Sequence, residues 1–219
     1  MKFADAAARL AVLPQRLPPP PPELMPVRLG PSDTSAGLPP RPAGPRRKAA
    51  VLVLVHPGPQ EEAMIVLIER SAGGHRHAGQ VAFPGGAVDP TDESVVAAAL
   101  REAREEVGLD VAQAGVRVLG AIGPVDIRVS GFLAHPVVAL AERPPLLRPD
   151  PHEVAHVFSV PLAGFLPGAP IEIVTDEWDG VRLRYGAYRV AGHVIWGATA
   201  GMLGGLGAVL AGASLSRGR

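Results

Sequence analysis

The chain has 219 residues, which is enough for one sizeable core and makes two full domains a tight fit. Lys plus Arg and Asp plus Glu each total 21, so the net charge is zero and a general affinity for nucleic acid or anionic membrane is not indicated. The lack of Cys excludes disulfides, thiolate metal sites and a cysteine nucleophile, and it fits a cytoplasmic protein.

Residues 1–48 are predicted to form an N-terminal helix followed by a proline-rich arm. The stretch MKFADAAARLAVLPQ carries Asp5 and Arg9 among its apolar residues, which indicates a short amphipathic helix rather than a secretory signal. Residues 14–48 contain 12 of the 25 Pro residues, which disfavours a regular helix or a central strand. We expect an extended arm that lies either on the core or on a partner subunit.

The predicted main domain covers residues 49–213, with 214–219 as a flexible tail. Its first element is a continuous apolar run at 49–56, typical of a strand buried on both faces, and 63–70 is expected to pair with it as a hairpin. Further strands are predicted at 115–122, 132–140 and 153–160, and at 171–174 and 181–190 around the turn DEWDG. With one central and one terminal helix, this pattern predicts an α+β fold in which helices pack on a mixed sheet.

The clearest helix signal covers residues 94–107. Acids and a Ser stand at its start, and Gly108 follows its end, which is where acids, caps and Gly are favoured. At about 100° per residue, three glutamates fall on one stripe and the apolar residues on the adjacent stripe. We expect that apolar stripe to face the core; it consists of Val96, Leu100, Ala103 and Val107.

The three crowded carboxylates have two interpretations. A charge-rich helix face is most often simply solvated. Glu102 and Glu106, however, are like charges at i, i+4, Glu105 crowds them, and Arg101 alone cannot neutralise all three. A divalent cation would relieve the repulsion, since Mg²⁺ and Mn²⁺ favour clustered carboxylate oxygens. The preceding FPGG turn at 83–86 would let a phosphate approach the backbone closely, which favours the second interpretation.

The C-terminal segment 194–215 has no charged residue and is long enough to span a bilayer. Gly201 and Gly205 form a small-xxx-small pair of the kind found between membrane helices. Most residues of the segment are nevertheless Gly or Ala, which have low hydropathy. A terminal helix packed on the core is therefore favoured over a membrane span.

The region around the acidic helix resembles the Nudix hydrolase signature, G-x5-E-x7-R-E-U-x-E-E-x-G-U, in which U is apolar. Glu93 is followed after seven residues by REAREEVGL, residues 101–109, which match in order. Six residues rather than five separate Gly86 from Glu93, while Asp92 stands at the five-residue spacing, so either acid could fill the first position. The resemblance implies a Nudix-type α/β/α sandwich with a mixed sheet and a loop-helix-loop metal site.

The segment VLIERSAGGHRHAGQVAFPGG, residues 66–86, is similar to the motif that precedes this signature in the coenzyme A pyrophosphatase branch of the family. Ile68 stands where that motif has Thr, and His75 where it has Arg, with Arg76 next to it. Segments further along the chain are also similar to this branch, namely 130–140, 150–162 and 195–203.

The resemblance implies a hydrolase that uses Mg²⁺ or Mn²⁺ to cleave the diphosphate bond of coenzyme A or its derivatives, giving 3′,5′-ADP and 4′-phosphopantetheine. A Nudix enzyme for another nucleoside diphosphate derivative, such as ADP-ribose or a dinucleotide, is the alternative. A non-catalytic binding module is a third hypothesis. The expected partner is thus a small molecule, with no nucleic acid and no membrane, and a homodimer is left open because dimers are common in the family.

Site residues follow from the same resemblance. Metal is expected on Glu102, Glu105 and Glu106, with Arg101 steadying these carboxylates. The general base is either Glu105 or Glu153, since either could lie within reach of the attacking water. Substrate contacts are expected from Arg70, Arg76, His77, Gly85 and Gly86. The aromatic residues Trp196, Tyr185 and Tyr188 are expected in the core rather than stacked on a base.

Overall fold

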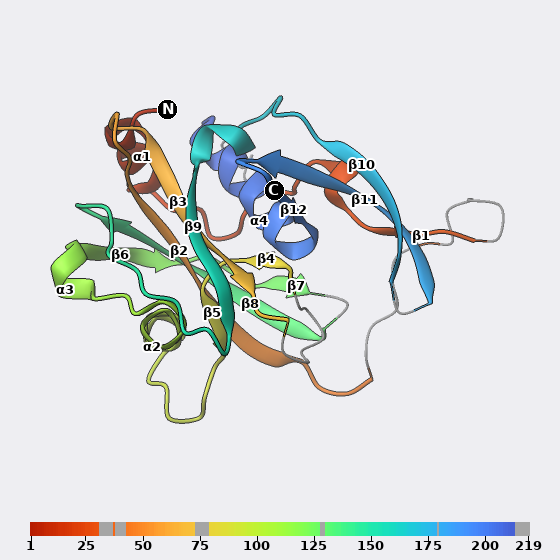
Figure 1. The fold of residues 1–219 in the computed structure, drawn as a ribbon, viewed down its shortest axis with the longest axis horizontal. Coiled ribbons are helices and arrows are strands. Elements are labelled where there is room, and N and C mark those ends of the chain that lie inside the picture. The colour runs from red at the N-terminus through yellow and green to blue at the C-terminus, as the bar shows by residue number, and fades with distance from the viewer. Residues whose placement is uncertain (31–36, 38–42, 73–78, 128–129, 179, 213–219) are drawn as a thin grey trace.

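The computed structural model describes residues 1–30, 37, 43–72, 79–127, 130–178 and 180–212. Within these residues, eight strands form one mixed sheet. They are β2 (Arg47–Pro57), β3 (Ala63–Arg70), β4 (Val81–Ala82), β5 (Gly85–Ala87), β6 (Val116–Ala121), β7 (Val125–Ile127), β8 (Phe132–Ala141) and β9 (Val154–Pro161). The central pair, β2 and β8, is parallel, and the other pairs are antiparallel (Figure 1).

A smaller sheet of four antiparallel strands among the described residues lies beside one face of the first. Its strands are β1 (Val27–Arg28), β10 (Glu172–Trp178), β11 (Val181–Val190) and β12 (His193–Trp196). The helical segments are α1 (Phe3–Leu10), η1 (Pro22–Leu24), α2 (Val95–Val107), α3 (Val111–Ala114), η2 (Leu162–Phe165) and α4 (Gly197–Leu210).

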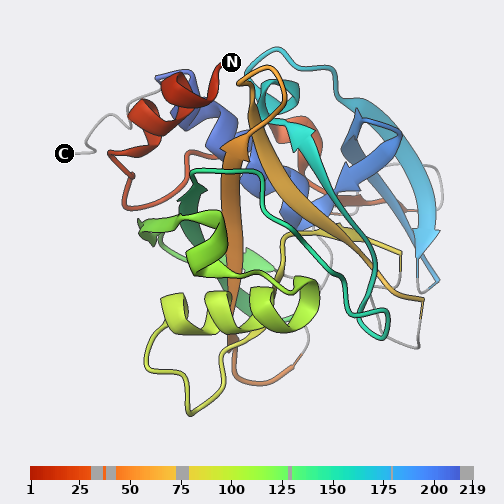
Figure 2. The ribbon, with the colours of Figure 1, turned by 60° about the vertical axis from the view of Figure 1, so that its left-hand side comes forward.

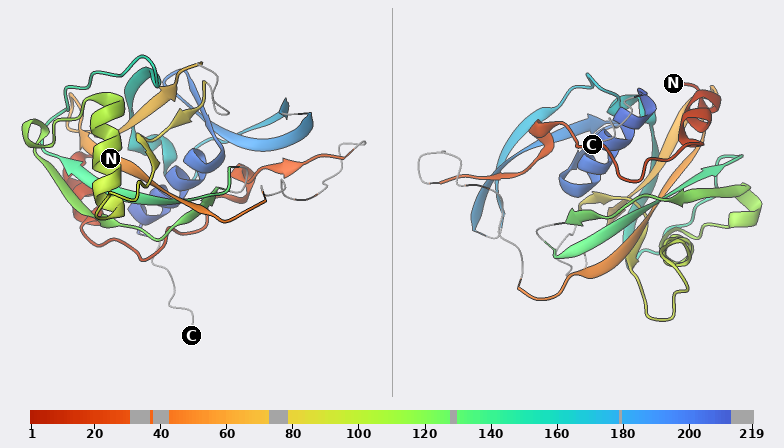
Figure 3. Two further views of the ribbon diagram at one scale, coloured as in Figure 1. Left: turned by 90° about the horizontal axis from the view of Figure 1, so that it is seen from below. Right: turned by 180° about the vertical axis from the view of Figure 1, so that it is seen from behind.

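Strand β2 explains the layering. Leu52 and Leu54 point to one face of the sheet and pack with α2, whereas Val53 and Val55 point to the other face and pack with α1 and α4. The right panel of Figure 3 shows α2 on one side of the large sheet and both α1 and α4 on the other, and Figure 2 shows the same separation from a second direction. The predicted α+β fold with helices on a mixed sheet is confirmed, as is the strand buried on both faces.

The proline-rich arm runs over the α4 side of the molecule. Leu24 of the arm is fully buried in the same cluster as the strand residues, as is Leu10 of the preceding helix α1, and the Pro18 carbonyl lies close to Gly205 of α4. The described part of the arm therefore lies on the core of its own chain, which is one of the two positions expected for it. The predicted boundary between the arm and the main domain, at residues 48 and 49, falls inside β2, which begins at Arg47.

Several short elements differ from the sequence-based expectations. Strands β4, β5, β7 and β12 and helix α3 were not predicted. The predicted terminal helix begins only at Gly197, because residues 193–196 pair with β11. No helix within the described ranges combines the length and apolar character needed to cross a membrane.

Candidate active site

Helix α2 carries the acidic cluster and has the predicted limits. The Ser94 side chain caps it by accepting a hydrogen bond from the Ala97 N–H at 3.1 Å, and Gly108 ends it in the left-handed conformation at φ 62°. Its buried face includes Ala98 and Ala99, which lie on the glutamate side of the predicted apolar stripe. The helix is thus turned so that Glu102 and Glu106 lie closer to the sheet than expected, and the small side chains of Ala98 and Ala99 allow the close approach.

Two residues predicted to lie in the core are instead at the edge of the buried face of α2. Ala103 and Val107 are buried as expected, whereas Val96 and Leu100 are only partly buried and pack against the margin of the cluster. The prediction that an apolar face of the helix packs on the core is therefore correct, but the centre of that face lies closer to the glutamates than predicted.

Arg101 holds three of the carboxylates near it. Its guanidinium donates to both Asp92 oxygens, at 3.0 and 2.9 Å, and one further nitrogen donates to Glu102 Oε1 and Glu105 Oε2, each at 2.9 Å. Asp92 is nearly covered, with 5% of its side chain exposed, and the guanidinium lowers its pKa below the usual range. Between the two candidates for the first acid of the signature, Asp92 is the one that contacts Arg101.

Glu106 extends into the sheet. Its side chain is 1% exposed; Oε2 accepts a hydrogen bond from the Gly85 N–H at 2.7 Å, and Oε1 lies 3.6 Å from Arg70 Nη1. Burial is the main cause that raises the pKa of Glu106 to about 7; the negative charges of Glu102 and Glu153 act in the same direction, and Gly85 and Arg70 oppose them in part. The Gly85 N–H and Arg70 therefore stabilise the ionised carboxylate only in part.

Two glycines allow β5 to lie close to its neighbours, Gly86 next to the helix and Gly85 next to β2. A Cβ atom on Gly86 would stand 2.5 Å from Glu102 Oε2, and one on Gly85 would stand 2.3 Å from the Ala50 carbonyl oxygen. Gly85 also has φ 151°, a conformation that side chains disfavour. Strand β5 thus presents bare backbone to Glu102 and Glu106.

The other predicted site residues differ in how close they lie to the buried acids. Glu105 is the outermost acid, with 55% of its side chain exposed. Glu153 lies near enough for its charge to raise the pKa values of Glu102 and Glu106, and its carbonyl accepts from the Ser71 N–H at 2.9 Å. Arg76 and His77 lie outside the described residues.

The acidic cluster fits a divalent cation by its chemistry but not by its present side-chain directions. Among the residues that the structure describes, no three His, Asp or Glu side chains converge as metal ligands. Glu102 and Glu105 are turned to Arg101, and Glu106 is turned to Gly85 and Arg70. The donor set is nevertheless oxygen-rich and short of positive charge at its buried end, which is the environment that Mg²⁺ and Mn²⁺ prefer.

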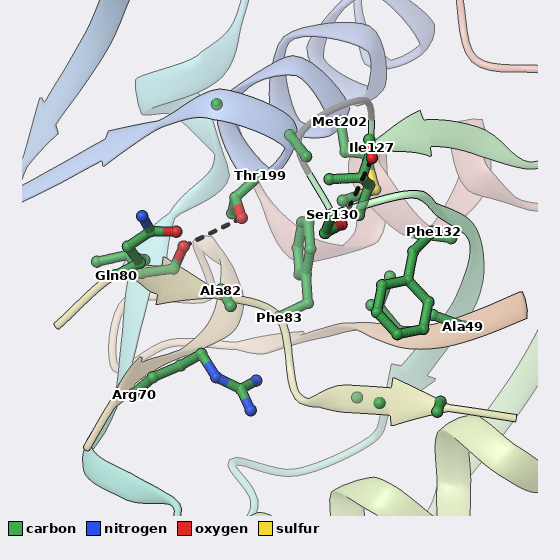
Figure 4. A pocket seen from close by; sticks show the side chains of 18 of the residues that line it. Ala49, Arg70, Gln80, Ala82, Phe83, Ile127, Ser130, Phe132, Thr199 and Met202 are labelled. Atoms are coloured by element: carbon green, nitrogen blue, oxygen red, sulfur yellow. Dashed lines mark hydrogen bonds between the residues drawn. The ribbon is translucent and has the colours of Figure 1, made fainter. Parts of the chain in front are cut away.

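A cavity of about 400 Å³ opens beside β5. Arg70 borders it near the acidic helix, Phe83 and Phe132 form apolar walls, and Gln80 and Thr199 add polar groups to its lining (Figure 4). The Thr199 hydroxyl donates to the Val81 carbonyl at 3.0 Å. The cavity is large enough to hold part of a small-molecule substrate next to Gly85 and Gly86.

Sequence reasoning missed the walls of this cavity. Trp196, expected in the core, lines the cavity and stacks on Tyr185 with ring centroids 4.5 Å apart, whereas Tyr185 and Tyr188 are buried as expected. No local signal marks Phe132 or Thr199 as neighbours of β5. Asp92 did carry a signal, namely its five-residue spacing from Gly86.

Comparison with known proteins agrees with this geometry. The family model of the NUDIX domain matches residues 45–181. "Uncharacterized Nudix hydrolase NudL" of Pectobacterium atrosepticum is 48% identical over 129 residues, covering 57% of this chain and 64% of that protein, just under two thirds of its length. The protein of the same name from Photorhabdus laumondii is 40% identical over 166 residues, covering 74% of this chain and 86% of that protein.

Two solved structures are also similar to this chain. The Nudix hydrolase RenU of M. Smegmatis has 24% identity and a TM-score of 0.47, covering 63% of this chain and 80% of its own. The NUDIX domain of Shewanella oneidensis NrtR, complexed with ADP ribose, has 21% identity and a TM-score of 0.42, covering 55% and 76%.

The family match and the sequence relatives define the class of the protein. The chain belongs to the Nudix family. The expectations of a Nudix-type fold and of a Nudix hydrolase are thereby confirmed.

Proposed function

We propose that this Nudix hydrolase cleaves the diphosphate bond of coenzyme A, giving 3′,5′-ADP and 4′-phosphopantetheine. The observation that carries the proposal is the placement of Arg70. It ends the strand of the motif at 66–86 that resembles the coenzyme A pyrophosphatase branch, and it stands both beside Glu106 and at the border of the cavity. A diphosphate at β5 would thus contact the Arg70 guanidinium at the point where the rest of the substrate enters the cavity.

Nudix enzymes generally use divalent metals such as Mg²⁺ or Mn²⁺. We assign the metal to Glu102, Glu105 and Glu106, whose oxygens match the preference of these cations. When bound, the cation supplies charge neutralisation for the diphosphate and lowers the pKa of the attacking water.

The chain's own residues supply binding and orientation. Gly85, Gly86 and Arg70 all border the cavity, so a diphosphate held there would lie against the β5 backbone, and Arg70 would contribute a charge-assisted contact. Arg101 keeps Glu102 and Glu105 on the substrate side of α2 through its hydrogen bonds. Arg76 and His77 remain predicted substrate contacts.

Glu105 and Glu153 remain the two candidates for the general base. Glu105 is exposed and bound on one oxygen by Arg101, which leaves its other oxygen available to accept a proton. Glu153 stands close enough to Glu106 to affect its pKa. The water would attack one phosphorus in line with the bridging oxygen, the base would take its proton, and the bridging P–O bond would break.

The test is to incubate the purified protein with Mg²⁺ or Mn²⁺ and a panel of coenzyme A, ADP-ribose, NADH and nucleoside triphosphates. Formation of 3′,5′-ADP at a rate far above the other products supports the proposal. Preferred turnover of ADP-ribose or a dinucleotide would select the alternative substrate instead. The absence of turnover with every diphosphate would overturn both.

Glu106→Gln supplies the matched variant for that assay. The amide keeps the shape of the side chain but loses the negative charge that a metal ligand needs, so turnover should be abolished while the circular dichroism spectrum is retained. Unimpaired turnover by Glu106→Gln would contradict the role assigned to this residue.

A further inference from the structure

An arginine without a carboxylate partner stands at the edge of the cavity beside β5. Arg47 is the first residue of β2, and its guanidinium lies 4.2 Å from the centroid of the Phe132 ring. Its side chain is exposed, and no Asp or Glu in the described part of the chain forms an ion pair with it. The preceding Arg46, by contrast, is paired with Asp126 at 3.3 Å. The N–H groups of Arg47 are therefore available to an anionic ligand.

Strand β2 places Arg47 on the cavity side of the large sheet. Side chains alternate between the two faces of a strand, and Ala49 and Val51, which follow at every second position, both line the cavity. Arg47 is also the register partner of Phe132 in β8, whose ring forms one wall of the cavity (Figure 4). The guanidinium therefore lies just beyond the cavity lining, at the end where β2 begins.

The cavity thus has a cationic group at each of two ends. Arg70 borders it beside Glu106, and Figure 4 shows Arg70 well apart from Phe132, on which Arg47 is stacked. Val51, the register partner of Gly85 in β5, is about 13 Å along the strand from Arg47. The long arginine side chain covers part of that length. A ligand held at both ends would therefore carry a second anionic group about one sugar ring away from its diphosphate.

We propose that Arg47, held on the Phe132 ring, binds a phosphate group on the ribose of the substrate and selects nucleotides that carry a 3′-phosphate. The inference rests on the proposed function, in which the diphosphate lies at β5 and the ribose of coenzyme A bears such a phosphate. The nucleoside then occupies the cavity, which suits the aromatic lining because bases stack on aromatic rings.

The chemistry of Arg47 fits this role. A planar guanidinium donates two parallel hydrogen bonds to a phosphate, which a point charge cannot do. The face of the Phe132 ring attracts the guanidinium and fixes its plane, while the N–H groups at the edge of that plane stay free. Phe132 thus acts as a positioning residue for Arg47 in addition to forming a wall of the cavity.

Binding of adenosine nucleotides tests this site without metal or turnover. The probes are adenosine 3′,5′-bisphosphate, adenosine 2′,5′-bisphosphate and AMP, titrated into the metal-free protein and followed by calorimetry. The 3′,5′-bisphosphate should bind about tenfold more tightly than AMP, which is the gain expected from one charge-assisted contact. The 2′,5′ isomer carries the same charge at a neighbouring position and should bind more weakly than the 3′,5′ isomer.

Two substitutions remove the site in different ways. Arg47→Ala deletes the guanidinium and should abolish the tenfold preference for the 3′,5′-bisphosphate over AMP, whereas Arg47→Lys keeps the charge without the planar fork and should retain only part of it. Phe132→Leu removes the ring beneath the guanidinium and should also lower the ratio of the two affinities. Circular dichroism confirms that each variant is folded.

Arg117→Ala is the matched control. Arg117 is an exposed arginine of β6, and its register partner Leu140 lies about 26 Å along β8 from Phe132. The variant loses the same charge at a distance from the cavity. It should therefore retain the wild-type ratio of affinities.

The outcomes separate this inference from the proposed function. Equal kcat/KM for coenzyme A and 3′-dephospho-coenzyme A, or equal binding of the two bisphosphates, would overturn the inference while leaving coenzyme A hydrolysis intact. A 3′-phosphate preference that survives both Arg47→Ala and Phe132→Leu would also overturn it, since the phosphate would then be bound elsewhere. A preference that depends on Arg47, without hydrolysis of either compound, would instead support the site and contradict the proposed function.

Discussion

At the residue scale, the Glu106 carboxylate is an ionisable group placed where its charge is poorly stabilised. It is 1% exposed, and its partners, the Gly85 N–H and Arg70, do not offset the effect of burial, which raises its pKa to about 7. The metal-free protein thus bears a free-energy penalty at this position whenever Glu106 is ionised. Stability is exchanged here for a negative charge at the proposed reaction centre.

We expect Glu106→Gln to stabilise the metal-free protein at alkaline pH. Because the pKa of Glu106 is higher in the folded state than its usual 4.5, folded protein binds more protons between pH 4.5 and about 7, and wild-type stability falls as pH rises through that window. The variant lacks this loss and should gain at most about 3 kcal/mol at pH 8 and little at pH 4.

Urea unfolding at pH 4 to 8 in the presence of EDTA measures this difference. A gain that is the same at every pH would mean that the effect comes from packing rather than from ionisation.

The acid that precedes α2 gives a second prediction at this scale. Asp92 makes two hydrogen bonds to Arg101 and is nearly covered, whereas Glu93 is exposed. Asp92→Ala should release Arg101 and lower kcat/KM by about 10- to 100-fold, as expected when a group that orients site carboxylates is lost. Glu93→Ala is the control and should remain close to wild type in the same assay. The reverse ranking would assign the first position of the signature to Glu93.

At the element scale, α2 and β5 pack against each other, and substitutions of the two glycines of β5 are predicted to have different effects. The three atoms nearest to a Cβ on Gly86 all belong to the flexible Glu102 carboxylate, at 2.5 to 2.7 Å, so Gly86→Ala should fold normally but displace Glu102 and reduce turnover. A Cβ on Gly85 would meet backbone atoms of Ala50 and Val51, at 2.3 and 2.6 Å, at φ 151°. Gly85→Ala should therefore lower the free energy of unfolding by more than about 1 kcal/mol.

Thermal unfolding and steady-state kinetics, measured on both glycine variants, distinguish the two effects. Loss of stability in Gly86→Ala equal to that in Gly85→Ala would show that the Glu102 side chain cannot move aside.

How much the sequence predicts also depends on the element. The limits of α2 were predictable because Ser94 and Gly108 act on their own helix ends. Strands β4 and β5 have two and three residues, too few for a periodic pattern, and they exist through pairing with β3 and β2. Long-range packing likewise decides that Trp196 lines the cavity beside β5. The position of the acidic cluster on α2 was therefore predictable from local spacing, and the walls of the cavity were not.

At the scale of the whole molecule, the arm and the sheet form one apolar core. Ala6, Leu10 and Leu24 from residues 1–30 lie in the same buried cluster as Val53, Leu203 and Tyr188. The arm also forms one side of a cavity next to α4. A division into an appended arm and a main domain at residues 49–213 thus describes the chain order, while the packing predicts that both parts unfold together.

That cooperativity can be tested with two substitutions close together in the N-terminal segment, just before the arm. Leu10 is 0% exposed and packs in the shared core, whereas Val12 is 80% exposed. Leu10→Ala should lower the free energy of unfolding of the entire chain by about 2 to 5 kcal/mol in a single urea transition, because it leaves a cavity against the sheet. Val12→Ala should stay within about 0.5 kcal/mol of wild type. If Leu10→Ala instead produces a separate early transition, or none, the N-terminal segment unfolds independently of the main domain.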